Sequence, residues 1–281
     1  MINQIKTVLF LGILTGLLLV IGALIGGQSG LTIALFIAIA MNFISYFFSH
    51  KIVLAMYKAK EVDKTKNPEL YEMVKDIALR ASIPTPKIYI IPSENPNAFA
   101  TGPNPKKAVV AVTRGIMNLL SKDELKGVLA HEIAHIKNRD ILISTIAATI
   151  AGAISYLAFM ARFAAIFGGM RGDGDNSNIF ELIALAIIAP IVAVIIQLAI
   201  SRSREFLADS TGAKIVKDPN SLADALQKLN TSAKEHPMKM GNQATAHMFI
   251  VNPFTAKSFF KLFSTHPDIN QRIGKLRSMI I

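Results

Sequence analysis

The chain has 281 residues, of which 52% are hydrophobic and only 17% are charged. That composition is typical of membrane proteins and unusual for a soluble enzyme. The complete lack of cysteine in the sequence excludes a disulfide framework, a cysteine-ligated zinc site and a thiol nucleophile. The formal charge of +11 could indicate nucleic acid as a partner. No arginine-rich tract or aromatic stacking motif accompanies that charge, so we expect no nucleic-acid partner.

Two apolar stretches open the chain. Val8–Ile25 and Leu31–Phe48 are nearly uncharged, and each approaches the ~20 residues that a helix needs to span a bilayer. The short link Gly26–Gly30 between them allows only a tight turn, so the pair predicts a helical transmembrane hairpin. A cleaved signal peptide would explain the first stretch alone, but the immediate return of a second span argues against it.

The next segment combines a helical pattern with short extended pieces. Apolar residues at helical spacing predict a helix over His50–Ala81, and nearby prolines end it. Lys87–Ile91, Asn95–Gly102 and Ala108–Thr113 are predicted to be extended, because the first is rich in β-branched residues and turn residues separate them. This segment therefore predicts a small sheet.

The motif His131-Glu132-Ile133-Ala134-His135 follows on a predicted helix, which a capping box over Ser121–Glu124 starts. Residues four apart share a helix face, so both imidazoles can reach one metal ion. The spacing is that of a zinc site with its own general base. Glu132 would take a proton from a zinc-activated water and deliver it to the leaving amine.

A second apolar pair, Ile141–Ala161 and Ile179–Ile200, is joined by the polar stretch Gly168–Asn178. All the lysines and arginines except Arg162 and Arg171 lie outside the two interhelical links. Positive residues favour the cytoplasmic side, so both termini and both larger polar segments are predicted to face the cytoplasm. Hydropathy leaves open whether the second pair spans the bilayer, is re-entrant or packs on a surface.

A catalytic zinc ion needs a third protein ligand beside the two histidines. The position six residues after His135 is Ile141, which excludes the metzincin pattern. Four acidic residues lie across the membrane or in a predicted mobile loop (Glu235–Ala246) and are set aside: Asp173, Asp175, Glu181 and Glu235. Glu205 remains. The second predicted hairpin lies between His135 and Glu205 in the chain and would return Glu205 to the neighbourhood of His135. Asp209 follows one turn later, where it could hydrogen-bond a ligand histidine. A surface glutamate is the alternative for Glu205.

The combination of this motif, Asp140, the run Ser201–Asp209 (SRSREFLAD) and four apolar stretches resembles the HtpX-type membrane zinc metalloproteases, relatives of the CAAX prenyl endopeptidases. The resemblance covers nearly the whole chain. It implies a gluzincin endopeptidase in a prokaryotic plasma membrane, working in quality control of membrane proteins and the stress response. It also implies Glu205 as third zinc ligand and Asp209 as the partner of a ligand histidine.

The segment from Asn97 to Gly102 also resembles the family, in which it forms an edge strand beside the catalytic helix. An extended peptide could add to such an edge as another strand. Asn97, Phe99 and Ala100 are therefore candidate substrate contacts. The alternative is an ordinary edge strand.

Thr265–Pro267 and Arg272 resemble the family's C-terminal motif, near the substrate. His266 could donate a hydrogen bond to the developing oxyanion, or it could be a structural histidine that caps the last helix. Asp140 could orient a metal ligand or only mark the end of its helix. The role of His247 stays open.

These patterns predict a mainly α, α+β fold, in which a zincin-like catalytic domain with a small β-sheet is combined with four transmembrane helices in two hairpins. The units are residues 1–49 and 141–200 for the hairpins, and 50–140 and 201–281 for the two catalytic parts. The expected function is a membrane-anchored zinc endopeptidase with one Zn²⁺ per chain, acting on misfolded or damaged membrane proteins. Its expected partners are unfolded or membrane-protein polypeptides and the lipid bilayer, while oligomeric state stays open. The alternatives are an intramembrane zinc protease and a non-catalytic four-helix membrane protein with a vestigial metal site.

Overall fold

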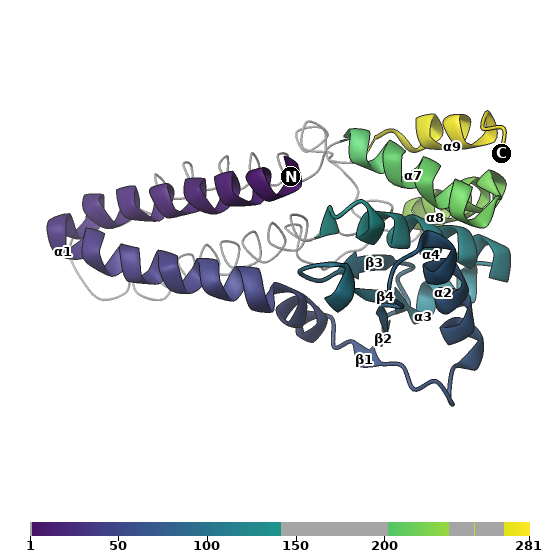
Figure 1. The fold of residues 1–281 in the computed structure, drawn as a ribbon, viewed down its shortest axis with the longest axis horizontal. Helices are drawn as coiled ribbons and strands as arrows, with labels where there is room; N and C mark the ends of the chain where they lie inside the picture. Colours follow the sequence, from purple (N-terminus) through teal and green to yellow (C-terminus); the bar gives the residue numbers. More distant parts are fainter. Residues whose placement is uncertain (1, 142–201, 236–249, 251–266) are drawn as a thin grey trace.

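The computed structural model describes residues 2–141, 202–235, 250 and 267–281. In these residues a long helical arm projects from a block that contains a small sheet and the shorter helices (Figure 1). The second predicted hairpin lies outside the described residues apart from Ile141, and so does the loop predicted after Glu235. Four transmembrane helices therefore remain a prediction.

The arm is the helix α1 (Ile2–Met56), which reverses direction at its glycine-rich centre (Figure 1). Gly27 has a φ of +54°, a conformation that favours glycine. The Asn42 side-chain amide donates a hydrogen bond of 2.8 Å to the hydroxyl of Thr15, whereas a straight helix would separate these residues by about 40 Å. The predicted helical hairpin is thus present, although the helical assignment continues through the expected turn.

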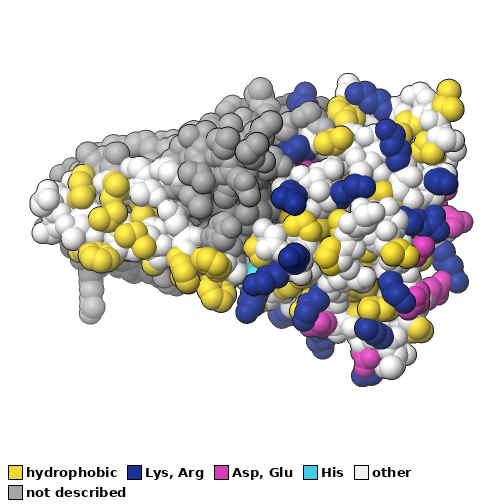
Figure 2. Space-filling model, viewed as in Figure 1, with side chains coloured by type: hydrophobic (Ala, Val, Ile, Leu, Met, Phe, Trp, Pro, Cys, Tyr) yellow, Lys and Arg dark blue, Asp and Glu magenta, His cyan; other side chains and the backbone are white. Residues whose placement is uncertain are grey.

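The second half of the hairpin presents apolar side chains to the outside (Figure 2). Gly27–Ile44 is long and apolar enough to cross a membrane, and only 11% of that window is buried. Phe36 is 69% exposed, and Ile33, Ile39 and Phe43 are each more than half exposed. Among the described residues this is the single helix that meets the requirement for a membrane span.

The sheet has four strands in the described part of the chain, in the order β1-β2-β4-β3. They are β1 (Lys60–Glu61), β2 (Lys87–Ile91), β3 (Ala98–Thr101) and β4 (Val109–Thr113). β2 and β4 are parallel, whereas the outer strands β1 and β3 each pair antiparallel with their neighbour. The three predicted extended pieces are confirmed, and β3 is an edge strand.

The helix predicted over His50–Ala81 is wrong in its middle. α1 ends at Met56 because Lys58 adopts a left-handed φ of +51°, and the chain then forms β1. The helix α2 (Pro68–Ala81) starts afresh, with its proline in the first turn, where no backbone N–H is needed. The two-residue strand β1 carries no alternation that a sequence pattern could reveal.

Capping residues mark the starts of three of the remaining helices. The Ser121 hydroxyl and the Glu124 carboxylate cap α4 (Lys122–Lys137) reciprocally, as predicted. Asp218 and Asp268 accept N-terminal backbone hydrogen bonds at the starts of α8 and α9. The other elements are η1 (Pro105–Lys107), α3 (Arg114–Leu119), α7 (Arg202–Val216), α8 (Pro219–Glu235) and α9 (Ile269–Arg277).

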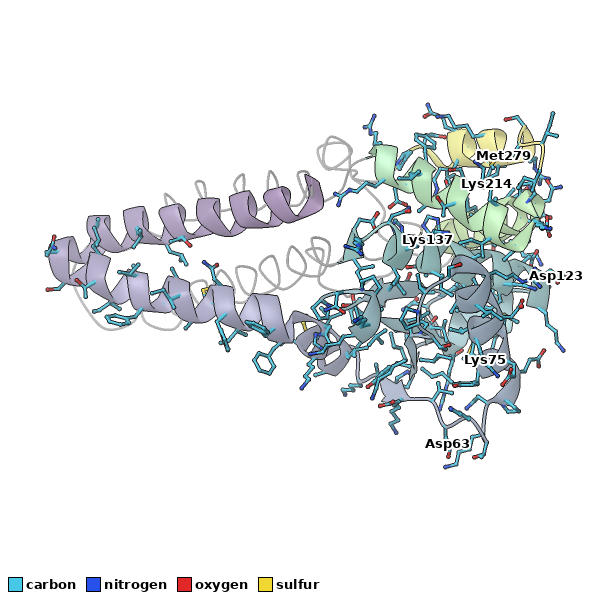
Figure 3. The ribbon with its side chains drawn as sticks, viewed as in Figure 1. Asp63, Lys75, Asp123, Lys137, Lys214 and Met279 are labelled. Atoms are coloured by element: carbon cyan, nitrogen blue, oxygen red, sulfur yellow. The ribbon has the colours of Figure 1, made fainter. Side chains whose placement is uncertain are left out.

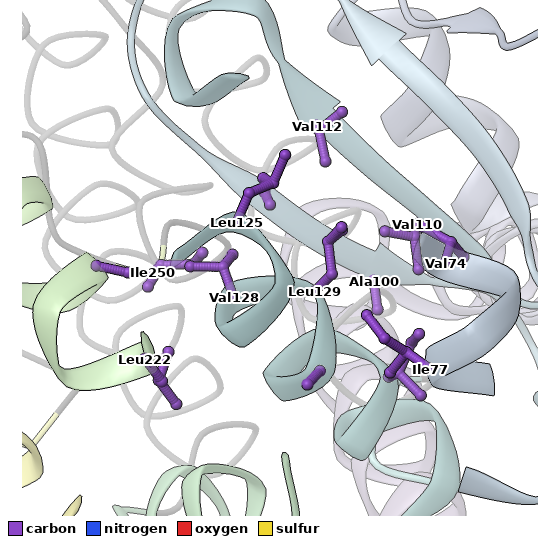
Figure 4. Close-up of a cluster of buried hydrophobic side chains, with 14 of the residues drawn as sticks. Val74, Ile77, Ala100, Val110, Val112, Leu125, Val128, Leu129, Leu222 and Ile250 are labelled. Atoms are coloured by element: carbon purple, nitrogen blue, oxygen red, sulfur yellow. The ribbon is translucent and has the colours of Figure 1, made fainter. Parts of the chain in front are cut away.

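Both faces of the sheet are covered. The larger core lies between one face and the helices α2, α4 and α8, as the labelled side chains of Figure 4 show. A smaller core on the other face joins Val53 and Leu54, at the base of α1, to Phe99 and Val109 of the sheet. The arm is therefore built into the block, while charged side chains such as Asp63, Lys75 and Asp123 lie at the block's periphery (Figure 3).

Candidate metal centre

The helix α4 supplies the two histidines of the motif. His131 and His135 lie one turn apart, and their Nε2 atoms are 3.1 Å from each other. The rings stand almost at right angles, with 4.6 Å between their centroids. Both Nε2 atoms thus converge on one point, as the spacing predicts.

Glu205 reaches the same point from α7. Its two carboxylate oxygens lie 3.7 Å from His131 Nε2 and 3.6 Å from His135 Nε2. The ligand atoms of the three residues all lie within 4.8 Å of one another. A tetrahedral zinc ion with bonds of about 2.0–2.2 Å would hold its ligand atoms about 3.3–3.6 Å apart. The observed separations and this nitrogen and oxygen donor set fit such an ion.

Gly212 allows the two ligand helices to approach closely. A Cβ atom at this position would lie 2.9 Å from the backbone of Ala130 and of His131. Any larger residue would therefore push α7 away from α4, and Glu205 lies on α7 two turns before the glycine. The lack of a side chain at Gly212 is what brings the third ligand within reach.

Glu132 is buried beside the two histidines, with 5% of its surface exposed. One of its carboxylate oxygens accepts a hydrogen bond of 2.8 Å from the backbone N–H of Ala100, in the edge strand. Burial raises the pKa of the Glu132 carboxyl above its ordinary value, although the charges of the neighbouring histidines oppose this effect. A raised pKa suits a group that must accept a proton near neutral pH and later give it back.

On the side away from the predicted metal, each histidine has a carboxylate next to its Nδ1 atom. Asp140 Oδ2 lies 3.0 Å from Nδ1 of His135, so the structure favours the orienting role for Asp140. Asp209 Oδ1 lies 2.9 Å from Nδ1 of His131. Burial lowers the pKa of His135, but Asp140 and the nearby glutamates outweigh burial and raise it to about 10.

Arg272 lies behind Asp209 and is 1% exposed. Its guanidinium donates two hydrogen bonds to the Asp209 carboxylate, from Nε at 2.9 Å and from Nη2 at 2.7 Å. Burial raises the pKa of Asp209, but Arg272 and His131 more than reverse this effect and hold that pKa at about 2. The sequence predicted a substrate contact for Arg272, whereas the structure places it against Asp209 in the interior.

The other predicted substrate contacts have different surroundings. Ala100 lies at the site through its backbone N–H. Asn97 is buried, and its side-chain oxygen accepts a hydrogen bond from the backbone of Ile250. Phe99 packs in the smaller core, with its ring 5.6 Å from that of Tyr57, on the face of the sheet opposite Ala100. His266 lies outside the described residues.

Two residues near the metal centre were not predicted from the sequence. Gly212 looks like an ordinary helical glycine, and only the crossing of the two helices reveals its purpose. Arg204 precedes Glu205, and its three guanidinium nitrogens are buried without a hydrogen-bond partner in the described part of the chain. Its place directly before Glu205 in the sequence is the signal that could have identified it.

The fold and the site define a class. A helix that carries two histidines and a glutamate, joined by a glutamate from a second helix near the edge of a small sheet, is the active-site arrangement of a metallopeptidase. Residues 64–280 match the family model described as Peptidase family M48. The chain therefore belongs to peptidase family M48, and the predicted resemblance to HtpX-type proteases is confirmed.

Relatives named Protease HtpX homolog match almost end to end. The protein of Thermodesulfovibrio yellowstonii is 57% identical over 278 residues, which cover 99% of this chain and 98% of the relative. The proteins of Persephonella marina and Pyrococcus furiosus are 57% and 54% identical and cover 99% and 98% of this chain, and 97% and 95% of their own lengths. The crystal structure of S. mikatae Ste24p has a similar fold, with a TM-score of 0.53 at 18% identity. That match covers 98% of this chain and 65% of the Ste24p chain.

Proposed function

We propose that the protein is a membrane-anchored zinc endopeptidase in which Glu132 is the general base. The convergence of His131, His135 and Glu205, with the buried Glu132 beside them, supports this proposal. Zn²⁺ bound there would polarise a peptide carbonyl and make a water molecule acidic enough to lose its proton near neutral pH. Two imidazoles and a carboxylate are a donor set that zinc favours.

The residues of the chain then perform the proton transfers. Glu132 accepts the proton from the attacking water and delivers it to the nitrogen of the leaving amine. The N–H of Ala100 fixes the carboxylate, with 2.8 Å between its nitrogen and Glu132 Oε2. The carboxylates of Asp140 and Asp209 face Nδ1 of each histidine, which leaves both Nε2 atoms for the metal.

The edge strand β3 supports an extended polypeptide as substrate. In the antiparallel pairing with β4, the backbone groups of Ala98 and Ala100 point away from β4. The N–H of Ala100 already donates to Glu132. An incoming strand can use the other groups, and only an unfolded segment is extended enough to do so. We therefore propose unfolded or damaged membrane proteins as substrates.

Replacing Glu132 with glutamine tests the mechanism. Purified protein in detergent with zinc should cleave casein, and the Glu132→Gln variant should bind zinc but lose about 10²–10⁴-fold in rate. Asp123→Asn, on an exposed position of the same helix, is the matched control and should cleave normally. Full activity of Glu132→Gln would overturn the general-base role, and an inactive, zinc-free wild type would overturn the proposed function.

A proline at Ala98 tests binding of the substrate at the edge strand. Proline removes an N–H that points away from β4, at the first residue of an edge strand, where proline is tolerated. The Ala98→Pro variant should lose cleavage through a raised KM while it retains zinc. Ala100→Pro is less informative, because it also removes the hydrogen bond to Glu132.

We also propose that the hairpin lies in the plasma membrane and that the catalytic block faces the cytoplasm. The exposed apolar side chains of α1 support insertion. The exposed Lys122 and Asp123 and the half-buried Lys126, all charged and on the metal-site helix, disfavour cleavage within the bilayer. Basic residues concentrate in the segments assigned to the cytoplasm.

The lack of cysteine in the sequence makes this topology simple to test. A single cysteine at Ser29, in the hairpin turn, should react in intact cells with a maleimide that cannot cross membranes. A cysteine at the exposed Lys106, in the block, should react only after the membrane is permeabilised. The reverse labelling pattern would overturn the orientation.

A further inference from the structure

Four carboxylates are buried around the predicted metal position: Glu132, Asp140, Glu205 and Asp209. A divalent cation would neutralise two of these charges. Buried charges are costly unless they are compensated. In the described part of the site, Arg272 pairs with Asp209, and the charge of Arg204 interacts with those of Asp140 and Glu205 without a hydrogen bond. The charges of the site then balance.

Arg272 has the stronger geometry of the two arginines. Its Nε and Nη2 atoms bind both oxygens of Asp209 at 2.9 and 2.7 Å, the two-pronged arrangement that arginine makes with carboxylates. Its Nη1 atom lies 3.5 Å from Oε2 of Glu205. The same atom donates a hydrogen bond of 3.4 Å to the backbone carbonyl of Ile250.

Arg272 therefore contacts one predicted metal ligand directly and a second through one residue. Asp209, which it holds, lies 2.9 Å from Nδ1 of His131. Glu205, which it also approaches, lies 3.7 Å from Nε2 of the same histidine. Arg272 comes from α9, at the end of the chain, whereas Asp209 and Glu205 come from α7.

We propose that Arg272 is a positioning residue for the metal, which holds Asp209 against His131 and limits the movement of Glu205. This inference rests on the proposed zinc site. It assigns Arg272 an interior role, acting through its two carboxylate partners, in place of a direct contact with substrate. The C-terminal helix α9 is thereby part of the metal centre.

Charge alone and positioning predict opposite changes in zinc affinity when Arg272 is removed. If Arg272 acted only through its positive charge, its removal would strengthen the binding of a cation. If it acts by positioning, its removal leaves Asp209 free to turn away from His131, and zinc binding weakens. Loss of residues that orient metal ligands typically costs about 10–100-fold in affinity.

Zinc affinity, measured without reference to peptidase activity, tests the inference. Full-length metal-free protein in detergent is titrated with zinc against a chromophoric chelator. Arg272→Gln should bind zinc about 10–100-fold more weakly than wild type. Arg277→Gln is the matched control, because Arg277 lies on the same helix in an exposed ion pair with Asp224, and its affinity should be unchanged.

Equal or tighter zinc binding by Arg272→Gln would overturn the inference while leaving the proposed function intact. Failure of the wild type to bind zinc would overturn both. Arg272→Lys keeps the charge but cannot reproduce the two-pronged contact, so it should also bind more weakly than wild type. Wild-type affinity of Arg272→Lys would show that charge alone suffices, against positioning.

A double variant guards against simple misfolding. Arg272→Met/Asp209→Leu replaces the buried ion pair with apolar side chains, a change that is often neutral or stabilising. Circular dichroism of the metal-free protein should therefore show a folded chain with a melting temperature near that of wild type. Its zinc affinity should still fall by about 10–100-fold, because His131 has lost its partner. Unchanged affinity in this variant would contradict the inference.

Discussion

Soluble proteins bury apolar side chains and expose charged ones. The arm α1 and the metal centre depart from this pattern in opposite ways. The arm exposes large apolar side chains such as Phe36 and Ile39, whereas the metal centre buries carboxylates and an arginine. Exposed apolar surface of this extent is costly in water, and buried charge is costly without counter-charge. Each region is therefore incomplete alone: the arm needs an apolar surrounding, and the metal centre needs a cation.

Glu205→Ala should have the largest effect, and only at the metal centre. Removal of a ligand should weaken zinc binding by more than about 100-fold, the upper end of the effect of residues that merely orient ligands. Membrane extraction behaviour should not change, because the arm is distant from α7 in sequence and has its own core contacts. Chelator competition and detergent extraction measure the two properties. A small change in zinc affinity would remove Glu205 from the ligand set.

Phe36→Lys should do the converse. Phe36 is 69% exposed in the apolar arm, and lysine near the centre of a bilayer costs about 2.5–3.5 kcal/mol. Membrane insertion should be impaired, and zinc affinity of the detergent-purified protein should be normal. Leu79→Lys is the control, since Leu79 is 77% exposed on α2 of the block and should tolerate the charge. Equal effects of the two changes would show that the arm is not in the membrane.

Gly212→Ala should loosen the contact between the two ligand helices. The added Cβ would lie 2.9 Å from the backbone of α4, and overpacking of this kind costs about 1–3 kcal/mol. Thermal unfolding of the metal-free protein should show the loss, and zinc affinity should fall with it. Gly274→Ala in α9 meets no atom within 4 Å and should stabilise by about 0.4–1 kcal/mol. A stable Gly212→Ala variant with normal zinc affinity would contradict the close-approach role.

The pH dependence of metal binding should be systematic. Carboxylates outweigh burial and raise the pKa of His135 to about 10 in the metal-free site, so the ring carries a proton at neutral pH. A metal ion must displace that proton, so affinity should rise by up to about tenfold per pH unit from pH 7 to 9.

The same proton gives folding stability the opposite pH dependence: the metal-free protein should lose stability as the pH rises. The contribution of His135 to the stability of the metal-free protein is fully present below the unfolded pKa of about 6.5. It is lost as the pH rises toward about 10, because the folded-state pKa is the higher of the two. Chelator titrations and thermal melts over this range measure both trends. Zinc affinity that does not change with pH would contradict a protonated His135.

The sequence predicted the hairpin and the start of the metal-site helix correctly, but not the segment that links the arm to α2. Apolar composition and a glycine-rich link were enough to predict the hairpin of α1, and the capping box at Ser121 marked the start of α4. The helix predicted through residues 57–67 was wrong, because a left-handed Lys58 and a short strand interrupt it. Such a turn depends on one residue's conformation, which the average pattern of the segment does not show.

The sequence by itself determined the chemistry of the site, because the spacing of His131, Glu132 and His135 on a helix fixes their common face. It also determined that part of the chain is suited to a membrane. Only the tertiary structure decided which carboxylate backs which histidine, and that Arg272 lies behind Asp209 and Phe99 faces away from the site. Those facts depend on how α4, α7, α9 and the sheet pack together. Local periodicity carries no record of contacts between residues that are far apart in the chain.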